Sequence, residues 1–340
     1  MDADRLRGLP KAELHQHLDG SLRPETAVEL ASAMGTSLTL DDARARMVGP
    51  AHCRDQAELL GFFDLPITLL QTASALERVA AELVDDLASD GIRYAELRWA
   101  PRLHLEGELS VGDVIDAVVR GVTRQTDGGP LIGLIVTAMR SHPPAANAEL
   151  ARTAGAFGWP VIGFDLAGPE AAWPAPPHAI AFVTAREAGL ELTAHAGEVS
   201  GAQRVREVLE FGVRRVAHGV TAVDDDGVLD ALRARDVTLD LCPTSNVQAG
   251  VVASLEAHPL AALHRAGVSV TISTDDRTVT GVGLSEEMAR TARAQSLSRD
   301  ELASIALNGF DRAFASRAAI APILADARRS WDAWRLSPIS

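Results

Sequence analysis

Cysteine and lysine are the scarcest reactive residues of this 340-residue chain. Its two cysteines, Cys53 and Cys242, leave no disulfide framework, which is typical of a protein from a reducing compartment. Lys11 is the sole lysine, and every other basic residue is an arginine. The formal net charge of −14 argues against a nucleic-acid partner, because neutralising phosphates takes clustered Lys and Arg side chains.

Long hydrophobic runs are also missing. No apolar segment reaches the roughly 20 residues of a membrane-spanning helix. The N-terminal stretch MDADRLRGLP is charged and lacks the apolar region of a signal peptide. We therefore expect a cytoplasmic protein that binds neither a membrane nor nucleic acid. A hydrophobic share of 47% still provides for a sizeable core.

Short runs rich in β-branched residues alternate with longer, alanine-rich amphipathic stretches. They predict eight strands, at about 12–18, 92–100, 131–139, 161–167, 190–197, 215–220, 238–244 and 269–275. This alternation favours an α/β fold, a single (β/α)8 TIM barrel formed as one domain by residues 1–340. Residues 19–91 are too long for one crossover, so we expect extra helices over the C-terminal face. The alternative is a doubly wound open sheet, but no G-x-G-x-x-G follows a predicted strand.

The first strand carries two histidines one residue apart, in the segment AELHQHLDGS. Because side chains alternate along a strand, His15 and His17 share one face and Gln16 takes the other. Active sites of barrels lie at the C-terminal ends of the strands. Three histidines and an aspartate at such ends can enclose one zinc and leave a position open for water. The candidates at predicted strand ends are His15, His17, Asp19, His195, Glu198, His218, Asp275 and Asp276.

Six segments also match a known family in order and spacing: PKAELHQHLDGSLRPET, GFDLAG, HAGE, RVAHG, CPTSN and STDD. From about residue 10 to 310 the chain resembles the adenosine deaminase family, the adenosine/AMP deaminase-like hydrolases of the amidohydrolase superfamily. The resemblance implies one zinc ion per chain. Its implied ligands are His15, His17, His195 and Asp275.

The same resemblance implies roles around a purine nucleoside substrate. Glu198 would donate a proton to the purine ring, and His218 would orient the attacking hydroxide. The implied substrate contacts are Asp276 to N7 and the attacking water, the Gly168 backbone N–H to N3, and Asp19 to a ribose hydroxyl. The zinc ligand His17 is also implied as a substrate-binding residue.

The chemistry of the residues agrees with these roles. Zinc makes water a nucleophile at neutral pH by lowering the pKa of bound water to about 7. Attack on the purine ring also requires a proton at N1, which a carboxylic acid near the metal can deliver. Glu198, three residues beyond His195, would have a raised pKa when buried against an apolar purine. The alternative for Glu198 is a solvated carboxylate in the first turn of a helix.

Two absences bear on the metal. Binuclear relatives of this architecture often bridge two ions with a modified lysine on a middle strand, whereas Lys11 precedes the first strand, so one zinc is favoured. The other zinc deaminase signature, H-x-E followed by P-C-x-x-C, is missing. Cys242 is interpreted as a buried, small apolar side chain under the barrel rim.

The remaining candidate positions either have two possible interpretations or are expected to have no function. Leu59, Leu60 and Phe63 fit an apolar lid over the substrate or ordinary core packing, and Ser245 and Asn246 fit a pocket rim or strand-end capping. Six histidines on predicted loops or helices are expected to be ordinary surface residues: His52, His104, His142, His178, His258 and His264.

The chain departs from the family pattern after Gly168, where Pro169 replaces the aspartate that usually precedes the glutamate, here Glu170, and after Asp276, in RTVTGVGLSEE. These changes bear on the substrate, since none is a proposed metal ligand.

The leading hypothesis is hydrolytic deamination of adenosine and 2′-deoxyadenosine to the 6-oxo nucleoside and ammonia. The alternatives are a modified nucleoside such as aminodeoxyfutalosine or a secondary-metabolite intermediate, hydrolysis of an amide or phosphoester at paired metals, and a non-enzymatic binding protein. Asp19 favours a nucleoside, because relatives that act on the free base tend to carry a glutamate there.

Overall fold

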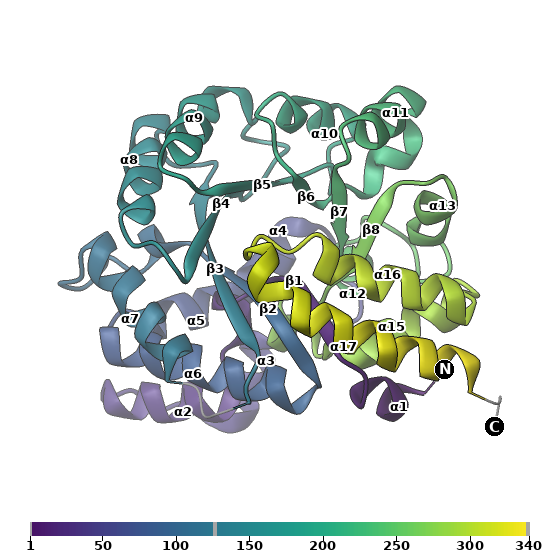
Figure 1. The fold of residues 1–340 in the computed structure, drawn as a ribbon. Coiled ribbons are helices and arrows are strands. Elements are labelled where there is room, and N and C mark those ends of the chain that lie inside the picture. Colours follow the sequence, from purple (N-terminus) through teal and green to yellow (C-terminus); the bar gives the residue numbers. More distant parts are fainter. Residues whose placement is uncertain (1, 125–127, 338–340) are drawn as a thin grey trace.

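The strands of the chain form one parallel sheet that curves into a barrel. The computed structural model describes residues 2–124 and 128–337. Eight strands follow one another around the sheet in chain order (Figure 1). They are β1 (Lys11–His17), β2 (Ile92–Trp99), β3 (Leu131–Met139), β4 (Val161–Ala167), β5 (Glu191–Ala196), β6 (Arg215–His218), β7 (Thr238–Leu241) and β8 (Ser269–Ile272). The predicted TIM barrel is confirmed.

The barrel nearly closes between its last and first strands. Past the end of β8, Asp275 pairs with Gln16 of β1 in an isolated parallel bridge. The His17 N–H donates to the Asp275 carbonyl at 2.7 Å, and the Asp275 N–H donates to the His15 carbonyl at 3.0 Å. The buried Gln16 side chain adds a hydrogen bond from Nε2 to the same Asp275 carbonyl at 3.0 Å. The seam of the barrel thus places Asp275 beside both histidines of β1.

Helices surround this barrel and cover one of its ends. Those after the later strands pack around the outside, as Figure 1 shows for α8 to α11. The flanking helices are α6 (Ala73–Ser89), α7 (Val111–Thr123), α8 (Pro144–Gly155), α9 (Ala179–Glu187), α10 (Ala202–Leu209), α11 (Asp226–Ala234), α13 (Leu260–Arg265), α15 (Leu284–Ala294) and α16 (Arg299–Asp311). In α6 and α16 the buried apolar residues recur at helical spacing, and each helix begins at a hydroxyl cap.

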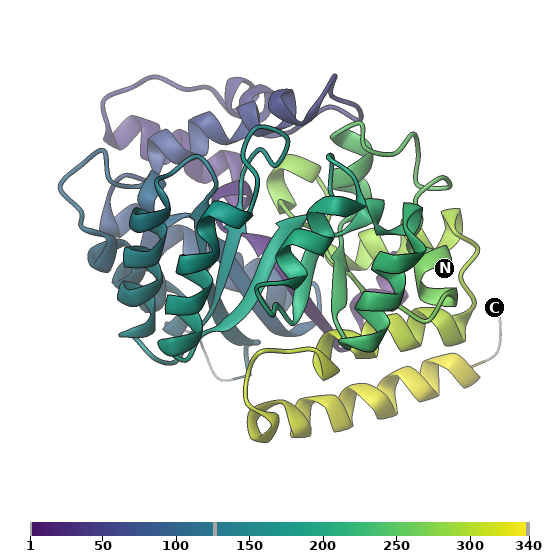
Figure 2. The same cartoon turned by 90° about the horizontal axis from the view of Figure 1, so that it is seen from above.

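The long segment after β1 forms the expected extra helices. They are α2 (Pro24–Ala33), α3 (Leu40–Met47), α4 (Gln56–Leu60) and α5 (Asp64–Leu69), with 3-10 turns at Asp19–Ser21 and Gly61–Phe63. Figure 2 shows this segment and the C-terminal helix α17 (Arg317–Leu336) on opposite sides of the molecule. Short helices complete the fold: α1 (Ala3–Arg7), α12 (Pro243–Gln248) and α14 (Arg277–Thr280), and further 3-10 turns at Pro101–Leu103, Pro176–His178 and Val220–Asp224.

Three strands end two or more residues earlier than the sequence pattern predicts. The expected ends at residues 220, 244 and 275 become His218, Leu241 and Ile272. His218, the last residue of β6, and Asp275, three residues past the end of β8, both have φ +64°, a left-handed conformation that is uncommon for a residue with a Cβ. Pro243 starts α12 and stops β7. Strained backbone therefore occurs at two candidate site residues, as it often does at functional positions.

Among the described residues, no helix is long and apolar enough to cross a membrane.

Candidate active site and metal centre

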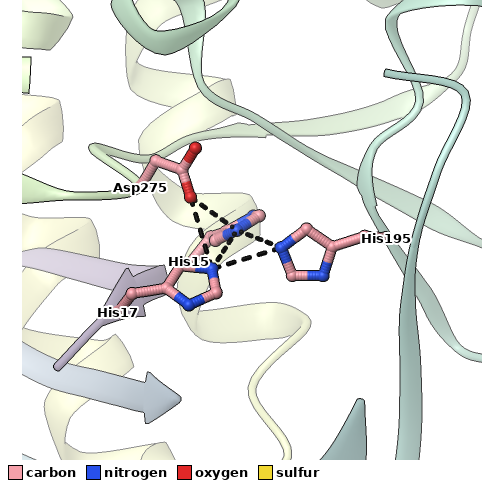
Figure 3. A group of neighbouring side chains, drawn as sticks. All are labelled: His15, His17, His195 and Asp275. Atoms are coloured by element: carbon pink, nitrogen blue, oxygen red, sulfur yellow. Dashed lines mark hydrogen bonds and ion pairs between the residues drawn. The ribbon is translucent and has the colours of Figure 1, made fainter. Parts of the chain in front are cut away.

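Three imidazoles and one carboxylate converge at the C-terminal ends of the strands (Figure 3). The Nε2 atoms of His15 and His17 are 3.2 Å apart, and the Nε2 atom of His195 lies 3.1 Å from the first and 3.2 Å from the second. Asp275 Oδ1 is 3.0 Å from His15 Nε2 and 3.4 Å from His17 Nε2. The structure thus brings together all four residues that the family resemblance implied as ligands.

The carboxylate of Asp165, the fifth residue of β4, fixes the orientation of His195. Its two oxygens lie 3.1 and 3.0 Å from His195 Nδ1, so this nitrogen carries the ring hydrogen. The lone pair of His195 Nε2 therefore points at the other two imidazoles. Sequence reasoning missed Asp165, although it lies in the quoted segment GFDLAG. A strand acid next to a ligand strand is a usable signal, because ligating histidines nearly always donate their second N–H to such a group.

Electrostatics keeps the imidazoles neutral and the carboxylate ionised. Burial lowers the pKa of His17 to about 4 and the pKa of His15 well below its usual value. Burial alone would raise the pKa of Asp275, but His15 and His218 outweigh that effect and hold its pKa well below the usual range. Neutral imidazole and ionised carboxylate are the forms that bind metals.

The donor set fits a zinc ion. Zinc–nitrogen bonds of about 2.0–2.1 Å place the ligand atoms of a tetrahedral ion about 3.3 Å apart, close to the spacing of these donor atoms. A second possible group joins His218, Cys242 and Asp275. It shares Asp275 with the first group, and burial raises the pKa of the Cys242 thiol well above its usual value, which disfavours the thiolate that a metal requires. Cys242 is buried, as expected.

Glu198 lies beside this cluster in the loop after β5. Burial, followed by the negative charges of Asp275 and Glu170, raises the pKa of Glu198 to about 8, so the carboxyl group is protonated at neutral pH. Gln56, at the start of α4, donates from Nε2 to Glu198 Oε2 at 2.6 Å. The Glu170 carboxylate accepts hydrogen bonds from three backbone N–H groups of this loop, those of Gly197, Val199 and Ser200. Sequence reasoning assigned neither Gln56 nor Glu170 to the site.

Asp276 is a second buried acid of the site, and it forms no ion pair within the part of the chain that the structure describes. Burial and the charges of Asp275 and Asp19 raise its pKa well above the usual value, and its Oδ1 atom has no hydrogen-bond partner among the described residues. Gly20 makes room for this carboxyl group, because a Cβ at that position would lie 2.0 Å from Asp276 Oδ1. The Oδ1 atom of Asp276 is thus free to form a hydrogen bond with a ligand in the site.

A cavity of about 290 Å³ opens onto the cluster. Its polar wall contains the candidates His17, Asp19, Gly168, His195, Glu198, His218, Asp275 and Asp276. Its apolar wall contains Leu59, Leu60, Phe63, Ile67, Leu103 and Met139. The three lid candidates therefore face the cavity, and Leu59 also packs in a small apolar cluster with Cys53 and Val279. Ser245 lines the rim and donates to Asp275 Oδ2 at 2.8 Å.

The expectation that six histidines lie on the surface is wrong for three of them. His104, His178 and His258 are buried, because the ring of each forms hydrogen bonds with residues of other segments that pack over it. His104 Nε2 lies 2.8 Å from Asp19 Oδ1, while the Ala100 N–H donates to Asp19 Oδ2 at 3.2 Å. Asp19 is therefore held from two sides at the cavity wall.

The fold and the cluster together define the class: the chain is a TIM barrel whose strand ends carry three histidines and one aspartate that could hold a metal ion. The sequence model of the adenosine deaminase family matches residues 10–327. Adenosine deaminase of Clostridium perfringens is 36% identical over 317 residues, 92% of this chain and 96% of that protein. Adenosine deaminase of a Mycobacterium species is 39% identical over 328 residues, 90% of each chain. The chain belongs to the adenosine deaminase family and is an aminohydrolase of that type, which confirms the resemblance.

Solved structures of related deaminases share the fold. Adenine deaminase of Arthrobacter aurescens superimposes with a TM-score of 0.88 at 28% identity, covering 94% of this chain and 98% of that one. The N6-mAMP deaminase of Arabidopsis gives 0.86 at 26%, covering 97% and 99%. An amidohydrolase of Burkholderia ambifaria with bound Zn also gives 0.86 at 26%, covering 97% and 92%. These neighbours differ in substrate, so the fold alone leaves the choice of 6-aminopurine open.

Proposed function

We propose that this enzyme binds one zinc ion per chain and converts adenosine, and also 2′-deoxyadenosine, with water into the corresponding inosine nucleoside and ammonia. The observation that carries the proposal is the shared cavity, in which a protonated carboxyl group and the donor cluster face an apolar wall. His15, His17, His195 and Asp275 would hold the zinc. When bound, zinc supplies the Lewis acidity that makes water a nucleophile at neutral pH.

The side chains of the cavity supply the remaining chemistry. Glu198, protonated at neutral pH, donates its proton to N1 of the purine, so that C6 accepts the oxygen of the attacking water. His218 and Asp276 orient that water, and Asp276 also contacts N7. The Gly168 N–H donates to N3 and fixes the ring in its plane. One proton of the attacking water then converts the C6 amino group into the leaving ammonia and the other returns to Glu198, while the 6-oxo product keeps its hydrogen on N1.

The cavity favours a nucleoside over a nucleotide. Four carboxyl groups line it, those of Asp19, Glu198, Asp275 and Asp276, and the lining residues include no lysine or arginine. A 5′-phosphate would therefore find no cationic side chain on the cavity wall to compensate its charge. Asp19, held by His104 and the Ala100 N–H, provides an oriented acceptor for a ribose hydroxyl. The higher identity to curated adenosine deaminases than to the N6-mAMP deaminase structure supports the same choice.

The single-ion site has structural support as well. Lys11 Nζ donates to the carbonyls of Leu6 and Leu9, at the opposite end of β1 from the cluster. It is thus remote from any position that could bridge two ions, and the hydrolysis of another bond at paired metals is disfavoured.

An ultraviolet deamination assay with zinc measured in the same sample tests the proposal. The substrates are adenosine, 2′-deoxyadenosine, adenine, AMP and aminodeoxyfutalosine. We expect the highest kcat/KM for adenosine and one zinc per chain. A clear preference for adenine, AMP or aminodeoxyfutalosine would replace the proposed substrate, and two metal ions per chain would overturn the single-ion site.

A further inference from the structure

A chain of buried side chains connects His218 to the backbone of α13 and was not expected from the sequence. Asn246 of α12 lies with Nδ2 3.2 Å from His218 Nδ1. His258, in the loop before α13, has Nε2 3.1 Å from Asn246 Oδ1. The Leu260 N–H lies 3.2 Å from His258 Nδ1. All three side chains are at least 97% buried, so water offers them no alternative partners.

The direction of every hydrogen bond in this chain follows from its first donor. A backbone N–H can only donate, so Leu260 makes Nδ1 of His258 an acceptor. Burial lowers the pKa of His258 to about 3, so the ring is neutral and its single hydrogen lies on Nε2. That Nε2–H donates to the Asn246 oxygen, which turns the amide NH2 group toward His218. Nδ1 of His218 is therefore an acceptor.

The remaining nitrogen of His218 faces the reacting groups. Its Nε2 atom lies 3.8 Å from Glu198 Oε2 and 3.8 Å from Asp275 Oδ2. With Nδ1 accepting from Asn246, a neutral His218 carries its hydrogen on Nε2 and points it into the space between these two carboxyl groups. The opposite tautomer would point a lone pair there.

We infer that Asn246 and His258 are positioning residues that hold His218 in the Nε2–H tautomer, so that His218 donates a hydrogen bond to the oxygen that attacks the purine. This inference rests on the proposed function for its catalytic consequence, but the tautomer itself is a property of the protein. It gives His218 the role of a donor that orients the oxygen and stabilises its negative charge, not that of a base that removes its proton.

Nitrogen NMR of the full-length zinc-loaded protein tests the tautomer directly. Long-range proton–nitrogen spectra of ¹⁵N-histidine-labelled enzyme distinguish protonated from unprotonated ring nitrogens. Signals of His218 and His258 are assigned from their loss in His218→Gln and His258→Gln. We expect hydrogen on Nε2 alone in both rings. Hydrogen on Nδ1 of His218 would overturn the inference, whether or not the enzyme deaminates adenosine. A failure of adenosine turnover with the expected spectrum would instead overturn only the proposed function.

Asn246→Asp tests the consequence with a side chain of the same size. It replaces the NH2 donor by an oxygen and so asks His218 to donate from Nδ1. We expect the hydrogen to move to Nδ1 and kcat to fall roughly 10²- to 10⁴-fold, the range seen when a catalytic histidine loses its partner or takes the wrong tautomer. Zinc content and KM should change little. Wild-type kcat together with an unchanged tautomer would contradict the role of Asn246.

His258 has a conservative and a disruptive variant. In His258→Gln the side-chain amide can still donate to Asn246 Oδ1, whereas His258→Leu cannot. We expect kcat within about threefold of wild type for the first and a loss of about tenfold or more for the second. His264→Leu, at a half-buried histidine on α13 outside the chain of hydrogen bonds, is the matched control and should keep wild-type kcat. Equal kcat values for His258→Leu and wild type would remove His258 from the inference.

Discussion

Buried charged groups lie in two layers of the same barrel. The inner layer consists of Glu96, Arg98, Asp165, Arg215 and Asp240, and the upper layer consists of the site residues at the C-terminal ends of the strands. The two layers differ in whether opposite charges compensate one another. In the inner layer each charge has a partner. Arg215 pairs with Glu96 and, at 2.9 Å from its Nε, with Asp240 Oδ2, while Arg98 Nη1 lies 3.4 Å from Asp165 Oδ2. Glu96 also accepts from the Tyr94 hydroxyl at 2.5 Å. The charges of these groups compensate one another, and none of the charged residues of this layer lines the cavity.

At the C-terminal ends of the strands the polar groups lack such compensation. The Nε2 atoms of three imidazoles face one another, and burial followed by the negative charge of Asp275 raises the pKa values of the acids Glu198 and Asp276. The difference identifies the groups that can bind a ligand. Polar groups without a hydrogen-bond or ion-pair partner in the protein are the ones that a metal or a substrate can bind. Changes in the upper layer should affect function with little effect on folding, and changes in the inner layer should do the reverse.

The largest effect is expected from His195→Ala. Losing one of three nitrogen donors should abolish stoichiometric zinc binding and reduce deamination to the detection limit. The inner-layer control is Asp240→Asn, which should keep the zinc while lowering the free energy of unfolding by roughly 3–5 kcal/mol, the usual cost of breaking a buried ion pair. Zinc analysis, activity and denaturant unfolding measure both. Stoichiometric zinc in His195→Ala would remove it from the ligands.

Glu198→Gln should come next. The amide has the same shape but no acidic proton, so kcat should fall about 10²- to 10⁴-fold, the usual contribution of a general acid. Zinc content should stay at the wild-type value because Glu198 is not among the four converging donors. Full activity in this variant would exclude Glu198 as the proton donor.

Asp165 connects the two layers, since it contacts both Arg98 and His195. Asp165→Asn should weaken zinc binding about 10- to 100-fold, because the partner of a ligating histidine fixes its orientation and basicity. Competition with a chelator measures the affinity. Thr137→Val is the control: it removes a hydroxyl 3.2 Å from Asp165 Oδ2 but leaves the contact to His195. Equal affinities of Asp165→Asn and Thr137→Val would contradict the orienting role.

The pH dependence of kcat/KM should report the raised pKa of Glu198. Burial raises this pKa to about 8, so the acid is protonated at neutral pH and loses its proton as the pH rises through 8. Activity should therefore fall on the alkaline side, about tenfold per pH unit well above the pKa. The Glu198→Gln enzyme lacks this titration, and its residual activity should be flat there. An alkaline limb that persists in Glu198→Gln must belong to another group.

The same contrast explains how far the sequence could predict this molecule. Strand periodicity placed β3 at 131–139 and β4 at 161–167 correctly, and the period of two put His15 and His17 on one face. It could not place contacts that depend on how loops fold. Nothing in the local sequence pattern distinguishes the buried His104 and His258 from the exposed His52, because burial in a loop does not follow the regular spacing that it has in a helix or strand. The partners of the ligands were therefore harder to predict than the ligands themselves.

The smallest predicted effect concerns His104, which acts on the substrate end of the cavity. His104→Leu removes the contact to Asp19 Oδ1 and leaves only the Ala100 N–H to hold that carboxylate. KM for adenosine should rise about threefold to tenfold, the cost of a loosened hydrogen bond to a charged group, while zinc content and kcat change little. The deoxy analogue that lacks the hydroxyl bound by Asp19 should show no such rise.

Comparing 2′-, 3′- and 5′-deoxyadenosine in wild type, His104→Leu and Asp19→Ala therefore identifies that hydroxyl. His104 positions Asp19 if the two substitutions lose discrimination at the same hydroxyl and the double variant is no worse than Asp19→Ala. Equal KM increases for all the analogues would show a general loss of packing instead. In that case the contacts of Asp19 with His104 and the Ala100 N–H would stabilise the fold, as the ion pairs of the inner layer do, and would not position Asp19 for the substrate.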